Sequence, residues 1–264
     1  MRKPWFHRPE QGRLAALLPA CTLLACTLAA CTVPPDAHVP EFARKQYEPF
    51  SRDAVVSIAL AEWRAFGARF DDEEEDAPIP SNKPERDPGL WQRVGLYWWL
   101  GLNANTPESR WTGKHDSNGA PFPPDRDATY AWSAAFISYV MRMSGAGPVF
   151  PYAAAHADYI NAAKSGNALL HAERPTTYAP REGDLICAGR ASARAITFDA
   201  LPAPRFPSHC DIVTHATPTL LTVIGGNVAD AVTARQIPID ANGLLADPRH
   251  AWFVILRLTD RPAS

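Results

Sequence analysis

The pattern of apolar residues predicts a helical N-terminal half. Apolar side chains recur every three or four residues between Ser51 and Phe70, which is the period of a helix with one buried face. Ser51 is a favoured N-cap residue for this helix. Three further helices are expected over 90–102, 131–143 and 153–165. Glycines after residue 143 fit the end of the third, because glycine readily adopts the capping conformation at a helix C-terminus.

From about residue 184 the pattern changes to short runs that are rich in β-branched residues. Such runs are typical of strands. The expected strands cover 184–188, 210–214, 220–224, 231–239 and 252–258. Helices followed by strands predict an α+β fold in which N-terminal helices pack on an antiparallel sheet.

The N-terminus has the pattern of an export signal. Basic residues precede a mostly apolar run from Leu14 to Ala30, which is short for a membrane span of about 20 strongly apolar residues. The run ends in Leu-Ala-Ala followed by Cys31 and resembles a bacterial lipobox, in which the cysteine is acylated. We therefore expect a lipoprotein signal peptide over 1–30 and a spacer over 31–46 that starts at the lipidated Cys31. An ordinary cleaved signal is the alternative.

This location narrows the expected surroundings of the mature chain. Thr32 rather than Asp follows Cys31, and by resemblance to Gram-negative lipoproteins this favours the outer membrane and its periplasmic face. A single domain is expected over 47–260, because about 230 mature residues can bury a sizeable core. A net charge of −2 gives no basic surface for nucleic acid.

Two cysteines remain besides the predicted lipid attachment site. Cys187 and Cys210 would lie in an oxidising compartment, where paired thiols readily form a disulfide. Two buried free thiols are the alternative interpretation. The sequence leaves both open.

Three polar residues have the order and surroundings of an acyl-transfer site. Ser133 lies near the start of a predicted helix, where free N–H groups and the helix dipole favour a developing anion. His209 directly precedes a predicted strand, and Asn227 ends a Gly-Gly-Asn sequence after another. A histidine can take the proton of a serine nucleophile while a third polar group orients the imidazole. We predict these roles for Ser133, His209 and Asn227.

Each of these residues has another interpretation. Ser133 is also a favoured N-cap residue, and Asn227 suits a turn after two glycines. Asp211 shares one face of its strand with His209 and is a rival orienting residue, whereas Cys210 points to the other face. His156 lies on a predicted helix and is a candidate for lining the cleft.

The motifs resemble the papain-like cell-wall peptidases of the NlpC and CHAP type. The segments that carry the resemblance are Trp132-Ser-Ala-Ala-Phe-Ile, Gly183-Asp-Leu-Ile, His209-Cys-Asp-Ile-Val and Ile224-Gly-Gly-Asn. The chain is also similar to the domain of unknown function 2272 family from about residue 50 to 258. The resemblance implies a papain-like fold, an activity on peptidoglycan or its peptides, and substrate contacts from Trp132, His156 and Asp211.

One departure from the papain-like pattern affects the expected chemistry. Ser133 stands where those families have the catalytic cysteine, and a serine hydroxyl needs a general base during attack because it does not ionise near neutral pH. We expect a lipid-anchored peptidoglycan hydrolase. An inactive cell-wall peptide-binding module and a scaffold lipoprotein are the alternatives. We expect no metal and no cofactor, because the His and Asp residues show no zinc-ligand spacing.

Overall fold

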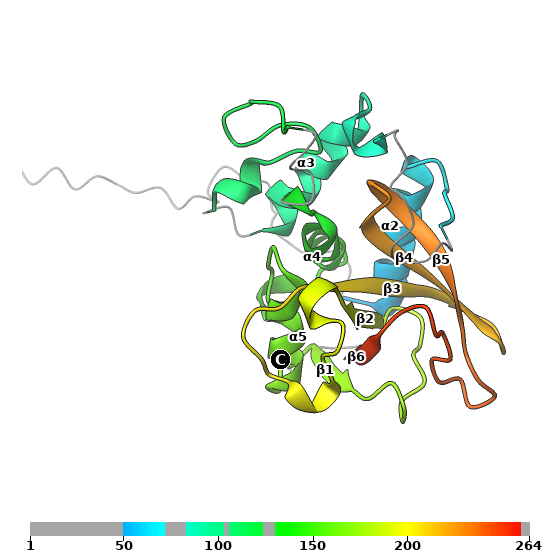
Figure 1. Cartoon of the computed structure of the whole chain (residues 1–264). Helices are drawn as coiled ribbons and strands as arrows, with labels where there is room; N and C mark the ends of the chain where they lie inside the picture. The colour runs from blue at the N-terminus through cyan, green and yellow to red at the C-terminus, as the bar shows by residue number, and fades with distance from the viewer. Residues whose placement is uncertain (1–49, 72–82, 103–105, 124–129, 260–264) are drawn as a thin grey trace, which may run out of the picture. The chain divides into compact units, whose positions relative to one another are not determined.

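A six-stranded antiparallel sheet forms the centre of the structure (Figure 1). The computed structural model describes residues 50–71, 83–102, 106–123 and 130–259. The strand order is β1-β6-β2-β3-β4-β5. The strands are β1 (Leu170–Glu173), β2 (Leu185–Gly189), β3 (Ser208–Ala216), β4 (Leu220–Val228), β5 (Ala231–Pro238) and β6 (Trp252–Leu258).

Helices cover one face of this sheet. They are α2 (Arg52–Ala65), α3 (Leu90–Gly101), α4 (Ser133–Met143) and α5 (His156–Lys164). Three of them, α2, α4 and α5, pack directly against strands, whereas α3 packs on α4 (Figure 1). The predicted α+β fold with helices on an antiparallel sheet is therefore confirmed.

Local chemistry explains where the first helix begins and ends. The Ser51 side chain accepts a hydrogen bond of 3.1 Å from the Ala54 N–H, as expected for an N-cap residue. The helix ends at Ala65, five residues before the predicted end at Phe70. Gly67 and Ala68 have φ values of 88° and 53°, and this left-handed backbone stops the helical ladder.

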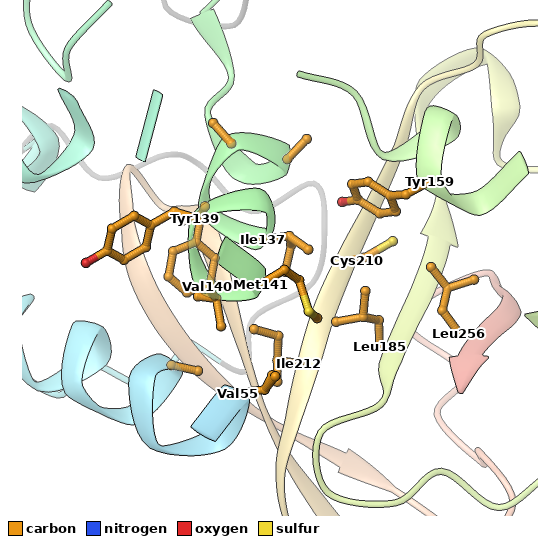
Figure 2. Close-up of a cluster of buried hydrophobic side chains, with 14 of the residues drawn as sticks. Val55, Ile137, Tyr139, Val140, Met141, Tyr159, Leu185, Cys210, Ile212 and Leu256 are labelled. Atoms are coloured by element: carbon orange, nitrogen blue, oxygen red, sulfur yellow. The ribbon is translucent and has the colours of Figure 1, made fainter. Parts of the chain in front are cut away.

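The main core lies between the helices and the sheet. Val55 of α2, Ile137 and Met141 of α4, and Ile212 of β3 are fully buried in it, and Figure 2 shows how these side chains converge from separate elements. Each such side chain contributes about 1.5–3 kcal/mol when it is removed from water. This packing fixes α4 against the sheet and so places the residue at its N-terminus, Ser133.

The close contact between α4 and β4 requires a glycine. A Cβ atom on Gly226 would lie 2.5 Å from the Cβ of Phe136, a distance at which one of the two elements would have to move. The second glycine of the Gly-Gly-Asn sequence therefore sets the separation between β4 and α4.

Cys187 of β2 and Cys210 of β3 are paired in register and form a disulfide. Both residues are fully buried. Of the two possibilities that the sequence left open, the structure has the disulfide rather than two free thiols. The bond joins two central strands directly beside His209 and Asp211.

The predicted signal peptide over 1–30, the lipidated Cys31 and the spacer lie outside the described residues and stay predictions. The chain divides into two units, Met1–Lys45 and Gln46–Ser264, and all described residues belong to the second of these. None of the helices in the described ranges has the length and apolar character needed to cross a membrane.

Candidate active site

Ser133 is the first residue of α4, and its hydroxyl contacts an imidazole. The Oγ atom lies 2.7 Å from Nε2 of His156. The N-cap of the helix is Trp132, whose side chain makes no capping hydrogen bond, so the alternative role of Ser133 as the N-cap is wrong. The N–H groups of the first helical turn have no partner within a helix and point toward this end. Ser133 thus combines a hydrogen-bonded hydroxyl with a site that favours negative charge.

His156 begins α5, and its second nitrogen is also bonded. Nδ1 makes a short hydrogen bond with the hydroxyl of Tyr159, one turn further along the helix. Burial lowers the pKa of His156 well below its ordinary value. Burial raises the pKa of Tyr159 well above its ordinary value. The set Ser133, His156 and Tyr159 is therefore neutral at physiological pH.

His209 lies inside β3 and has a charged partner on the same strand. Its Nε2 is 2.8 Å from Oδ1 of Asp211, and Oδ2 of Asp211 accepts a hydrogen bond from Arg235 of β5. Burial opposes ionisation of Asp211, but the charge of Arg235 and the hydrogen bonds hold the pKa of this carboxyl well below its usual range. Burial and the charge of Arg190 lower the pKa of His209 to about 4, against the raising effect of Asp211.

The two imidazoles are neighbours. The ring centroids of His156 and His209 are 5.3 Å apart. The residues on the helices and those on the strands therefore form one cluster, which consists of Ser133, His156, Tyr159, His209, Asp211 and Arg235. Ser133 is 8%, His156 4% and His209 3% exposed. The cluster is therefore shielded from water, which strengthens electrostatic interactions within it.

Gly225 makes room for the strand-borne part of the cluster. A Cβ atom at this position would lie 2.0 Å from Oδ1 of Asp211 and 2.9 Å from Nε2 of His209. Both glycines of the Gly-Gly-Asn sequence are thus required by close packing, one against the His209–Asp211 pair and one against Phe136 of α4.

The predicted orienting role of Asn227 is corrected by this geometry. Nε2 of His209 is bonded to Asp211, the rival that the strand periodicity had indicated. Asn227 has a φ of 57°, and its buried Oδ1 has no hydrogen-bond partner among the residues that the structure describes. Asparagine tolerates this left-handed backbone better than most residues, which explains its place after the two glycines.

Trp132 and Asp211 are not placed to contact a substrate as predicted. Trp132 is 1% exposed, and its indole N–H donates a 2.5 Å hydrogen bond to Glu85. Burial raises the pKa of Glu85 to about 7, although the Trp132 hydrogen bond lowers it in part. Asp211 is fully buried and bonded to His209 and Arg235. The indole and the carboxylate therefore support the site from within the core.

A family model matches most of the region just described. The family described as "Uncharacterized protein conserved in bacteria (DUF2272)" matches residues 85–258. The chain belongs to the DUF2272 family. No curated protein and no solved structure matches the chain.

The match gives the limits of the DUF2272 domain relative to the site. Every residue of the cluster, from Ser133 to Arg235, lies within the matched range, whereas α2 precedes it. The resemblance from about residue 50 is thus supported over its larger, C-terminal part.

Two features of the cluster could not be predicted from the sequence. Arg235 carries no motif of its own, and the hydrogen bond between Ser133 and His156 depends on how α5 returns to α4. Within the described ranges, no group of three or more His, Cys, Asp or Glu side chains is arranged to hold a metal ion.

Proposed function

We propose that the DUF2272 domain is a serine hydrolase that cleaves amide bonds in peptidoglycan or its peptides, with Ser133 as the nucleophile. The observation that carries this proposal is the 2.7 Å contact between Ser133 Oγ and His156 Nε2 at the start of α4. A hydroxyl, an imidazole within hydrogen-bond reach and the N–H groups of a helix start are the parts that acyl transfer needs.

In the proposed first step, Ser133 Oγ attacks the amide carbonyl carbon and its proton moves to His156 Nε2. This transfer requires the other proton of His156 to be on Nδ1, directed to the oxygen of Tyr159. Backbone N–H groups at the start of α4 stabilise the oxyanion. The C–N bond then breaks, and the departing amine takes the proton from His156.

In the second step, water attacks the acyl-serine ester. His156 takes one proton of the water, the carboxylic acid product leaves, and the proton returns to Ser133. Burial, His209 and Arg190 oppose the protonated form of His156 and keep its pKa low, whereas the negative charge of Asp211 favours this form and so supports the transient positive charge. Together the two steps consume one amide bond and one water molecule, and they regenerate Ser133 and His156.

The proposed substrate follows from the predicted location. A lipid on Cys31 and a spacer over 32–46 would hold the domain within roughly 50 Å of a membrane surface. In the periplasm of a Gram-negative cell, this range includes the peptidoglycan layer. The resemblance of the Ser133 and His209 segments to cell-wall peptidases points to the same substrate.

The test is cleavage of purified muropeptides by the mature protein, followed by mass spectrometry. We expect new amide-cleavage products with the wild type and none with Ser133→Ala. Ser144→Ala is the matched control, because this buried serine lies at the other end of α4 and bonds the Met141 carbonyl. Absence of products from the wild type, or equal cleavage by Ser133→Ala, contradicts the proposal.

A peptide-binding module without turnover is the second candidate. The nearly complete burial of Ser133, His156 and His209 favours it, because a substrate needs access to the nucleophile. Muropeptide binding without cleavage by the wild type, with no activity gained in Ser133→Cys, would support this second candidate over the first.

A further inference from the structure

The His209–Asp211 pair is the inner end of a longer chain of buried polar groups. Arg235 bonds Asp211 through Nη2, and its Nη1 is 2.9 Å from Nε2 of His250. Nδ1 of His250 is 2.7 Å from Oδ2 of Asp247. The chain crosses from β3 to β5 and ends in the segment before β6.

The direction of each hydrogen bond in this chain follows from the groups themselves. A guanidinium has only donors, so His250 Nε2 accepts and His250 Nδ1 carries the proton that Asp247 accepts. An ionised carboxylate only accepts, so Asp211 receives N–H groups from both Arg235 and His209. His209 therefore carries its proton on Nε2, and Nδ1 has the free lone pair.

Burial of the Arg235 guanidinium opposes folding. It is 5% exposed, and a buried charge is destabilising unless close partners compensate it. Asp211 and the His250–Asp247 pair supply those partners on two sides. An apolar residue could fill this buried position without the desolvation free energy of a charge. The presence of arginine therefore points to a role for the charge itself.

We propose that Arg235 is a positioning residue, which keeps Asp211 ionised and thereby fixes His209 in the tautomer with its lone pair on Nδ1. His250 and Asp247 hold the guanidinium in place. This assignment deepens the proposed hydrolase, because a histidine of defined tautomer beside His156 can accept a proton, but the arrangement itself can be tested without any substrate.

The charged groups around His209 determine what removal of Arg235 does. They are Arg190, Asp211 and Arg235, and the neutral imidazole of His156 lies beside them. Loss of Arg235 removes one positive charge from the His209–Asp211 pair and leaves the negative charge of Asp211. The pair then binds a proton more readily, so its pKa rises.

The experiment is an NMR pH titration of the imidazole groups of the full mature chain, labelled with ¹⁵N at histidine. In the wild type we expect His209 to protonate at a pH of about 4. In Arg235→Gln we expect protonation of the pair at a pH higher by about one unit or more, whereas Arg235→Lys keeps the wild-type value more closely. Arg257→Gln is the control, because Arg257 pairs with Glu173 between β6 and β1. No shift in folded Arg235→Gln, or an equal shift in the control, overturns the proposal.

A second measurement keeps the proposal testable if Arg235→Gln does not fold. The ¹⁵N chemical shifts of the wild-type imidazoles report which nitrogen carries the proton. We expect Nε2–H on His209 and Nδ1–H on His250, and the opposite tautomer on His209 overturns the assignment. Failure of muropeptide cleavage alone contradicts the proposed hydrolase and leaves these two results unaffected.

Discussion

Two histidines whose ring centroids are 5.3 Å apart have different hydrogen-bond partners. His156, at the start of a helix, contacts the hydroxyl groups of Ser133 and Tyr159. His209, on a strand, contacts Asp211, which is held by Arg235. One imidazole therefore touches the candidate nucleophile without a charge, and the other has a charged partner that fixes its tautomer.

The contact with the Ser133 hydroxyl and the contact with the Asp211 carboxylate are therefore made by histidines on two different elements. In a Ser-His-Asp triad, one histidine both touches the serine and bonds the carboxylate. Here α5 supplies the contact and β3 supplies the charge. If both are needed for catalysis, substitution of either histidine lowers the rate. Only a substitution within the set of His209, Asp211 and Arg235 can change the number of buried charges.

Removal of the Ser133 hydroxyl is expected to have the largest effect. Ser133→Ala should lower muropeptide cleavage by at least about 10³-fold, because the nucleophile is lost. The free energy of unfolding should fall by only about 1–2 kcal/mol, because Ser133 does not cap its helix and the substitution removes one neutral hydrogen bond, to His156. Cleavage rates and urea unfolding measure the two quantities. A large loss of stability in Ser133→Ala would show a structural hydroxyl instead.

The two histidines should differ in their effect on the rate. We expect His156→Gln to lower cleavage by about 10²–10⁴-fold, because it removes the group bonded to Ser133. His209→Gln should have a smaller effect, because Ser133 keeps its bonded imidazole. The reverse order in kcat would assign the general base to His209, as the sequence motifs alone had indicated.

Neutral and charged partners should differ in their effect on stability. Asp211→Asn leaves the buried Arg235 without its counter-charge, and we expect a loss of about 3–5 kcal/mol in the free energy of unfolding. Tyr159→Phe removes one neutral hydrogen bond to His156 and should lose about 1–2 kcal/mol. Urea unfolding of both variants measures this difference. Equal losses would contradict the division into a neutral and a charged set.

The disulfide should stabilise the strand side of the site. It spans a sequence separation of 23 residues, for which loop entropy predicts about 3 kcal/mol. We expect the double variant Cys187→Ala/Cys210→Ala to lose about this amount in urea unfolding. Treatment of the wild type with a reductant in urea should give the same loss, and no change under either condition would contradict the disulfide.

Acid should weaken the folded state through His209 by a smaller amount. The unfolded chain binds a proton on this histidine below a pH of about 6.5, whereas the folded chain binds it only near a pKa of about 4. Stability from His209 is thus complete above pH 6.5 and is lost as the pH falls toward 4, by about 2 kcal/mol at pH 5. The raised pKa of Glu85 acts with the opposite sign.

The effect of Glu85 cancels when two proteins that both contain it are compared. The measurement is therefore the change in unfolding free energy from pH 7 to pH 5 in the wild type, minus the same change in His209→Gln. A difference near zero would show that His209 titrates normally in the folded chain.

Local periodicity predicted the parts of the site that lie on one element. The position of Ser133 at a helix start follows from the apolar spacing after residue 131, and strand alternation places His209 and Asp211 on the same side. The two glycines of the Gly-Gly-Asn sequence belong to the motif, but the atoms that they accommodate become visible only in the folded chain.

Contacts between different helices and strands could not be predicted from the sequence. The bond between Ser133 and His156 depends on the path from α4 to α5, and Arg235 reaches Asp211 because β4 and β5 pair with Val223 opposite Arg235. Strand β1 was also missed, because Leu-His-Ala-Glu is short and has no β-branched residue. Such features result from tertiary packing, which a periodicity in one segment does not encode.

The most direct test of Ser133 as a nucleophile uses a fluorophosphonate probe and needs no knowledge of the substrate. The purified protein is incubated with the probe, digested and analysed by mass spectrometry. We predict a covalent adduct on the peptide that contains Ser133, with much slower labelling in His156→Gln and none in Ser133→Ala. No adduct in the folded wild type, or an adduct at another serine that persists in Ser133→Ala, would contradict a catalytic Ser133.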